Sequence, residues 1–218
     1  MKRLVFATIC CSLLFMCNVN AQKKFKMSLL SSINAGFIDN SGKSNSDLKK
    51  IYPDFNEGSI SQASLSIGYN FNFCKNYNAE FNMDYILGNS GNKKQFKSLY
   101  GGGFNLLFGY TFLKKEGFEI DANTGCKLSF DNFSYNRKND DNTISSLNLS
   151  SMNTFIPVGI TYWFTSKALE TKSRAVGFRL TYNFLVARSF AQFTGLNART
   201  DITCPTSSSL WFGVIFKI

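Results

Sequence analysis

Apolar and polar residues alternate along most of the chain. In the segment 63–73, the odd positions are Ala, Leu, Ile, Tyr and Phe, whereas the even positions are Ser, Gly and Asn. A period of two is typical of a β-strand, because successive side chains point to opposite faces. One face of this segment is apolar and ends in aromatics, which is typical of a strand with lipid on one side and a wet or tightly filled barrel interior on the other.

The same alternation predicts eight strands. They are expected at 27–38, 59–73, 77–87, 96–112, 118–130, 152–164, 175–186 and 208–218. Each reaches the roughly 9 to 11 residues that cross a bilayer at a tilt of about 45°. Beyond residue 21 no apolar run of helical length occurs, so only a closed barrel could satisfy the backbone in lipid. The predicted fold class is all-β, an eight-stranded antiparallel transmembrane up-and-down β-barrel.

The lengths of the connections predict the orientation of this barrel. Short connections follow the second, fourth and sixth strands, at 74–76, 113–117 and 165–174, and long polar ones are expected at 39–58, 131–151 and 187–207, with 88–95 as a shorter exception. Outer-membrane barrels have short periplasmic turns and longer outer loops. Both ends of the mature chain are therefore expected in the periplasm, and the aromatics near both ends of the strands are expected to form two girdles. A soluble lipocalin-type barrel is the alternative, with large apolar groups inside.

Residues 1–21 have the layout of a secretory signal peptide. A charged start at Lys2 and Arg3 is followed by an apolar stretch at 4–16 and a small-residue end before Gln22. The apolar stretch is shorter than the roughly 20 residues of a spanning helix. We therefore predict a cleaved signal peptide at 1–21 and one outer-membrane β-barrel domain at 22–218. Lipidation at Cys17 is the alternative, although Met16 stands where a small residue is usual.

Composition points away from an enzyme. The chain has no His, which removes the usual general base and the commonest metal ligand. Gly101-Gly102-Gly103 lacks the flanking residues of a phosphate-binding loop. Cys74, Cys126 and Cys204 lack metal-ligand spacing and are expected too far apart for a disulfide. We predict no catalytic, cofactor-binding or metal-binding residues, and no cofactor.

The net charge of +10 is expected to concentrate at the periplasmic ends rather than on a nucleic-acid-binding surface. The basic residues there are Lys23, Lys24, Lys26, Lys75, Lys114, Lys115, Lys167, Lys172 and Arg174. They are suited to anionic headgroups of outer-membrane lipids or to an acidic periplasmic partner, and no nucleic acid is expected. Lys97, Asp131 and Arg188 are assigned to the outer loops and rim.

Charged residues also fall on the faces that should line the interior. They are Glu80, Asp84, Glu119, Asp121, Lys127, Arg179 and Lys217. Acids and bases are nearly balanced, and eight strands enclose about enough room for side chains alone. We therefore expect a closed interior in which these charges pair with one another.

Three features carry a resemblance to a known family: the Ala21/Gln22 junction, the segment FIPVGITYWF at 155–164, and the terminal strand. With them the chain resembles the Bacteroidetes-type outer-membrane β-barrel (PorT-like) family, similar in architecture to small OmpA/OmpX-type barrels. The end of the chain at 213–218 resembles the signal read by the barrel-assembly machinery, with Ile218 in place of the commoner Phe. Pro157 is expected to mark a bulge or bend.

These patterns predict a non-enzymatic integral protein of the outer membrane. Its barrel is expected to be a structural anchor, and its outer loops are expected to bind a surface ligand or to support envelope integrity. Two alternatives remain open, an accessory component of a secretion or assembly machine and a narrow pore.

Overall fold

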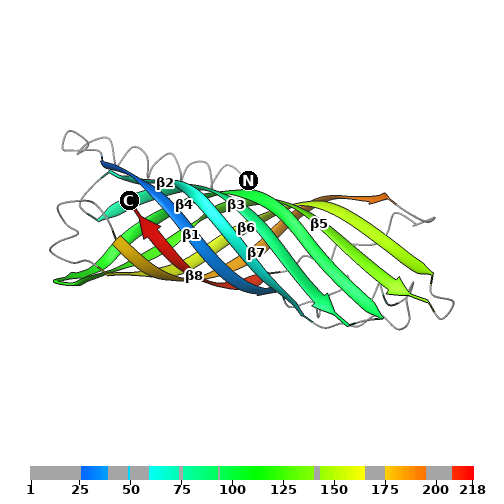
Figure 1. Cartoon of the computed structure of the whole chain (residues 1–218). Coiled ribbons are helices and arrows are strands. Elements are labelled where there is room, and N and C mark those ends of the chain that lie inside the picture. The colour runs from blue at the N-terminus through cyan, green and yellow to red at the C-terminus, as the bar shows by residue number, and fades with distance from the viewer. Residues whose placement is uncertain are drawn as a thin grey trace.

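The computed structural model describes residues 26–38, 49, 59–73, 76–92, 94–139, 143–164, 175–194 and 208–218, with the backbone alone for 189–194. Within these ranges, eight strands form a closed barrel in which each pairs antiparallel with its neighbour in the chain and β8 pairs with β1 (Figure 1). They are β1 (Lys26–Ile38), β2 (Ile60–Asn72), β3 (Tyr77–Gly91), β4 (Gln95–Lys115), β5 (Phe118–Lys138), β6 (Ile144–Phe164), β7 (Ala175–Thr194) and β8 (Ser209–Lys217). The predicted fold class is confirmed. The proposed signal peptide, Cys74 and Cys204 lie outside the described residues.

The strands differ in length, which makes the two ends of the barrel unlike. β4, β5 and β6 have 21 residues each and β7 has 20, whereas β1 and β2 have 13 and β8 has 9. At one end, called here the projecting end, the longer strands extend past the others, with β5 and β6 reaching furthest (Figure 1). At the opposite, turn end, β1 begins, β8 ends, and Gly117 with φ of 91° closes a tight turn between β4 and β5.

The expected outer loop at 131–151 is wrong. β5 continues to Lys138 and β6 begins at Ile144, and the two stay in register from Asp131↔Ser151 to Lys138↔Ile144. The expected loop at 187–207 likewise begins with strand, because β7 runs to Thr194. The alternation of β5 and β6 continues past the predicted strand ends. In this extension the large apolar side chains are on the inward face of the strands instead of the outward face. Strand ends predicted from outward apolar residues are therefore too early.

Within the described ranges, no helix is of a length and apolarity that would let it span a membrane. The connection predicted at 88–95 is also shorter than expected, since β3 runs to Gly91 and β4 begins at Gln95. The side-chain oxygen of Asn92 accepts hydrogen bonds from the backbone nitrogens of Lys94 and Gln95, over 2.9 and 3.0 Å. Such a local bond replaces the ladder bonds that a tight turn cannot make.

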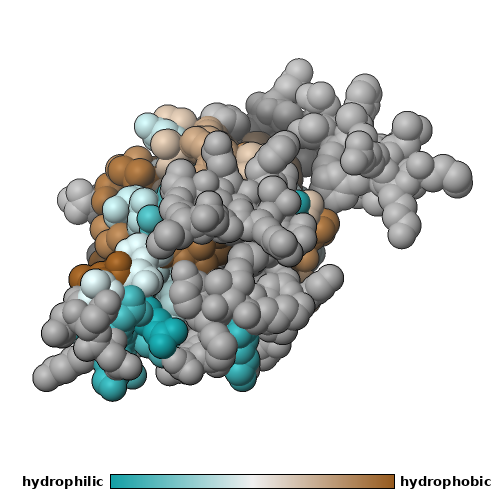
Figure 2. All heavy atoms as spheres, turned by 90° about the vertical axis from the view of Figure 1, so that its right-hand side faces the viewer, coloured by the Kyte–Doolittle hydropathy of each residue, from teal (hydrophilic) through white to brown (hydrophobic). Residues whose placement is uncertain are grey.

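The outward face of the barrel is apolar around all eight strands. Ile33 of β1 and Leu65 of β2 are 60% and 59% exposed, and the free thiol of Cys126 lies on this surface as predicted. Aromatic rings gather at the turn end, where Phe118, Tyr162, Phe164 and Phe178 form a chain of ring contacts with centroid distances of 5.4, 4.9 and 5.7 Å. The lipocalin alternative is wrong, because the large apolar groups of the barrel's middle face outward. Figure 2, viewed from the projecting end, shows apolar side chains along the flanks and hydrophilic ones at the lower edge.

Glycines on the inner face make room for the bulky inner side chains. Trp211 of β8 lies opposite Gly36 of β1, and Trp163 of β6 lies opposite Gly177 of β7. A Cβ atom on Gly36 would stand only 2.4 Å from the ring of Trp211. The two indoles therefore fit inside a narrow barrel because each covers a residue without a side chain.

β6 is irregular around Pro157, as expected. Its pairing with β5 is interrupted at Ile156 and Pro157, since proline has no N–H to donate to the ladder. Its register with β7 shifts between Thr154 and Phe155. Gly101-Gly102-Gly103 lies inside β4, which is a strand and not a phosphate-binding loop.

Candidate functional site

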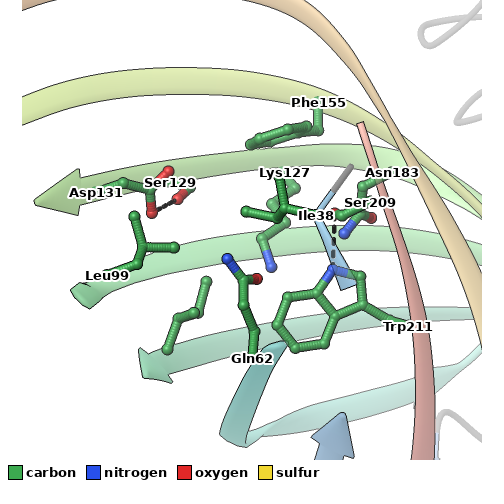
Figure 3. Close-up of a pocket in the computed structure, with 11 residues that line it drawn as sticks. Ile38, Gln62, Leu99, Lys127, Ser129, Asp131, Phe155, Asn183, Ser209 and Trp211 are labelled. Carbon is green, nitrogen blue, oxygen red and sulfur yellow. Dashed lines mark hydrogen bonds between the residues drawn. The ribbon is translucent and has the colours of Figure 1, made fainter. Parts of the chain in front are cut away.

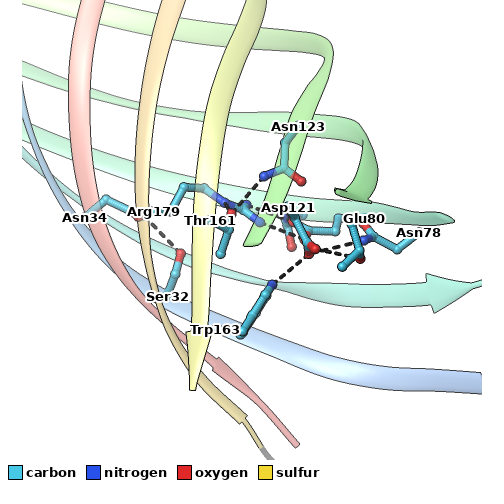
Figure 4. Close-up of polar contacts among 11 residues, drawn as sticks. Ser32, Asn34, Asn78, Glu80, Asp121, Asn123, Thr161, Trp163 and Arg179 are labelled. Carbon is cyan, nitrogen blue, oxygen red and sulfur yellow. Dashed lines mark hydrogen bonds and ion pairs between the residues drawn. The ribbon is translucent and has the colours of Figure 1, made fainter. Parts of the chain in front are cut away.

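A layer of charged side chains crosses the interior near the turn end (Figure 4). The guanidinium of Arg179 on β7 donates to both carboxylate oxygens of Glu80 on β3, over 2.8 and 2.7 Å. β3 and β7 are not neighbours, so this ion pair spans the barrel. Glu80 is only 1% exposed, and a carboxylate so buried needs a cation and hydrogen bonds to remain charged. The Nε atom of Arg179 also donates to Thr161 of β6, over 2.7 Å.

Asp121 of β5 is the second acid of this layer. Its carboxylate accepts hydrogen bonds from Trp163 Nε1 over 2.8 Å and from Thr111 Oγ1 over 2.7 Å. Asn78 of β3 adds a longer bond of 3.4 Å. The ring of Trp163 also faces the ammonium of Lys217 on β8, 5.7 Å from its centroid, which is within the range of a cation–π contact. One carboxylate thus connects β3, β4, β5 and β6.

A further ion pair lies midway along the interior. Lys127 Nζ of β5 is 2.7 Å from Asp84 of β3, and both side chains are buried. Asn105 of β4, the strand between them, donates to the same carboxylate oxygen. Lys127 also lies over the ring of Trp211 at 5.6 Å. The two buried acids of β3, Glu80 and Asp84, are therefore each held by a cation from another strand.

A small cavity marks the boundary with the projecting half (Figure 3). Asp131 of β5 accepts hydrogen bonds there from Ser129 and, over 2.8 Å, from Asn153 of β6. The cavity has about 20 Å³ of free space, and Gln62 and Trp211 help to line it. This space holds about one water molecule. Lys127 and Asp131, which help to line this cavity, are both buried, so side chains occupy the described interior at this level.

Above this cavity most buried side chains are apolar, although Lys97, opposite Tyr135, is also buried there. The buried residues of this cluster are Ile38, Ile60, Ile86, Leu99, Phe133, Tyr135, Leu147, Leu149 and Trp211. Sequence reasoning expected a polar interior throughout and treated Ile86 as a departure from the pattern. The cluster could have been found by following the alternation past Phe130. Phe133 and Tyr135 are at odd positions of β5, as are the inward-facing Lys127 and Ser129.

Most of the charges predicted for the interior do lie there. Glu119 is less buried than these, at 23% side-chain exposure, and pairs with the exposed Lys114 at the turn end. The assignment of Lys97 and Asp131 to the outer loops and rim is wrong, since they face inward with exposures of 2% and 3%. Arg188 is half-buried on β7 rather than in a loop. For Asp131 and Arg188 the reason is that β5 and β7 continue beyond the predicted boundaries. Lys97 fell within the predicted strand at 96–112, and its side chain is on the inner face rather than at the rim.

This arrangement is suited to holding strands together. Among the described residues, no group of three or more His, Cys, Asp or Glu side chains is placed to hold a metal ion. The acids Glu80, Asp84 and Asp121 are engaged by cations or hydrogen-bond donors from other strands. Of the predicted basic rim, Lys26, Lys114 and Lys115 lie in the described ranges, whereas the other members fall outside them.

A closed antiparallel barrel with an apolar exterior and an internally paired interior defines the class of small transmembrane β-barrels. The chain is similar to a solved structure of a major outer membrane protein from Thermus thermophilus, with a TM-score of 0.51 and 11% identity. The match covers 88% of this chain and 99% of the Thermus chain. Neisserial surface protein A covers 90% and 99%, with a TM-score of 0.48 and 11% identity. Ail of Yersinia pestis covers 88% and 97%, with a TM-score of 0.45 and 8% identity.

No family model matches the chain, and no curated protein matches it. At 11% identity, the likeness to the Thermus protein shows a common fold. The resemblance to PorT-like barrels stays a prediction.

Proposed function

We propose that this chain is a non-enzymatic integral protein of the outer membrane, whose closed barrel anchors a projecting sheet and its loops at the cell surface. The observation that carries the proposal is the distribution of side chains. Large apolar groups are exposed around the whole barrel, whereas buried charges are paired inside it. Exposing such a surface to water is costly, and in lipid a closed barrel satisfies its own backbone.

Membrane embedding can be tested by gel mobility. A closed, hydrogen-bonded barrel resists detergent until it is boiled, so the protein should migrate differently before and after heating. It should also stay with the membrane after a carbonate wash. Identical mobility in both samples, together with release by carbonate, would show that the protein is not an integral barrel.

The filled interior supports an anchor over a pore. Cross-barrel pairs such as Glu80–Arg179 occupy the space that a channel would need, and the cavity near Asp131 holds about one water molecule. Purified protein in planar bilayers should therefore show no steady current. A reproducible ion current from protein that is heat-modifiable would favour the pore.

The same proposal places the turn end and both mature termini in the periplasm, because short turns face that side in known outer-membrane barrels. A protease site inserted at 140–142, between β5 and β6, should be cut in intact cells. The same site inserted between Glu116 and Gly117 should be cut only after the outer membrane is opened. The reverse result would invert the barrel. The segment 213–218, most of which belongs to β8, is proposed to engage the barrel-assembly machinery.

A further inference from the structure

The projecting part of β5 and β6 has two contrasting faces. Its inward face is apolar and buried, with Phe133, Tyr135, Leu147 and Leu149 at most 3% exposed. Its outward face ends at the tip with the exposed pair Lys138 and Ile144, and below that pair it consists of small neutral polar residues. They are Asn132, Ser134, Asn136, Ser146, Asn148 and Ser150, named here the Asn/Ser face.

Hydrogen bonds across the strand pair order this face. The hydroxyl of Ser150 donates to the side-chain oxygen of Asn132 over 2.6 Å, and the hydroxyl of Ser146 donates to that of Asn136 over 2.8 Å. The β5–β6 register places these residues directly opposite each other. The amide planes are thereby held on a rigid sheet before any ligand arrives, and such preorganisation lowers the entropy cost of binding.

The six residues of the Asn/Ser face carry no charge, and Lys138 lies next to Asn136 on the same side of β5, at its tip. Lys97 and Asp131 point inward and are buried. Lys94 and Lys138 stand at the tips of the strand pairs, beyond the face. Phosphate and carboxylate groups are recognised by Arg and Lys, so this surface is poorly suited to an anion. Amides and hydroxyls both donate and accept hydrogen bonds, which matches the hydroxyl groups of neutral sugars.

The position of the face relative to the apolar surface indicates where such sugars would come from. Phe130 and Met152, opposite each other one step below Asn132 and Ser150, are 44% and 36% exposed and belong to the apolar band. Tyr100 of β4 lies opposite Asn132 on the other side and is 50% exposed. The Asn/Ser face therefore continues the lipid-facing surface outward with an aromatic ring at its edge, and such rings offer an apolar body against which a sugar ring can pack.

We propose that the Asn/Ser face binds the neutral sugar headgroups of glycolipids in the surrounding outer leaflet. This inference rests on the proposed function, because it requires the barrel to stand in a membrane with its projecting end outward. The ligand class assigned to the sheet is an uncharged glycolipid. The acyl chains of the lipid would lie against the apolar band, and its sugars would bind the amides and hydroxyls of the Asn/Ser face.

The test uses the full mature barrel in phosphatidylcholine nanodiscs containing a minor fraction of digalactosyl diacylglycerol. Native mass spectrometry then counts the glycolipid molecules that the released protein retains. The variant N132A/N148A/S150A removes three hydrogen-bonding side chains from the face, and the matched control K94A/K138A removes the tip charges instead. We expect the wild type and the control to retain the glycolipid, and the triple variant to lose at least about tenfold in retention.

The outcomes separate the two levels of the proposal. If the barrel inserts and is heat-modifiable, but the wild type and the triple variant retain the glycolipid equally, the sugar site is wrong. Retention that falls only in K94A/K138A would overturn it as well, because the tip lysines rather than the Asn/Ser face would then hold the sugar. If the protein does not insert into lipid at all, the proposed function itself fails. Heat-modifiability of every variant shows that a loss of retention is not a loss of folding.

Discussion

Replacement of Arg179 by Met removes the cation from the ion pair that spans the interior while keeping a side chain of similar length. Glu80 then stays buried and loses the two hydrogen bonds of 2.8 and 2.7 Å that the guanidinium donates. Thr161 loses its bond from Arg179 Nε in the same change. The perturbation therefore tests whether the interior is a dry, paired layer or a hydrated space.

The expected cost is large because the buried carboxylate loses its cation and keeps a long hydrogen bond of 3.4 Å from Asn82. Removing one partner of a buried ion pair costs about 3 to 5 kcal/mol. The double variant E80Q/R179M places a neutral amide where the carboxylate stood, so it should recover most of that loss. Lys114→Met provides the matched control, because Lys114 forms its ion pair with Glu119 while 59% exposed. Exposed pairs contribute less than about 1 kcal/mol.

The measurement is the free energy of unfolding in lipid vesicles, from urea titration followed by gel mobility without boiling and by tryptophan emission. Reasoning from the buried pair is refuted if Arg179→Met costs no more than Lys114→Met, or if the double variant is as unstable as the single one. The first result would mean that water reaches Glu80, and the closed interior would then have to be abandoned. The second would mean that the cost comes from lost packing and from the lost bond to Thr161 rather than from an unpaired charge.

Three further changes test other parts of the barrel. Leu65→Arg, on the outward face, should lower the unfolding free energy in lipid vesicles by about 2 to 4 kcal/mol, and a neutral effect would argue against lipid at that position. Gly36→Val should displace the ring of Trp211, which lies against this glycine, and should shift the tryptophan emission to longer wavelength in a Trp163→Phe background. Phe133→Ala should cost about 3 to 5 kcal/mol in the same unfolding assay, as for other buried Phe residues, whereas the loop expected from sequence would tolerate it.

Sequence periodicity was sufficient to predict the strands where they cross the membrane, because lipid on one side and a packed interior on the other give two chemically distinct faces. It missed the projecting sheet because the chemistry of the faces exchanges there. Lys127 and Ser129 face inward, and so do Phe133 and Tyr135 on the same strand. The period persists through this exchange, and only the position of the apolar residues changes. If strands were predicted from the alternation itself, whichever face is apolar, β5 would have been extended to its observed end.

The interior charges illustrate a second limit. Alternation placed Glu80 and Arg179 on the inner face, but it could not show that they meet. Their contact depends on the stagger of the strands around the closed ring, which shifts each strand relative to its neighbours. Even Asp131 and Asn153, on adjacent strands, are brought together only by the register between β5 and β6. Pairing across a barrel is a property of closure, which a single sequence does not display.

The short final strand has a consequence for how the ring is made. β8 has nine residues, so its backbone bonds to β1 and β7 are few compared with those between the long strands. Yet it delivers Trp211 to the apolar cluster and Lys217 to the ring of Trp163. The closure of the ring at β8 is therefore stabilised by side-chain contacts in the interior as well as by the backbone pairing of β8 with β1 and β7. An arc of seven strands would lack both inserts, so closing the ring and packing its interior form one cooperative step.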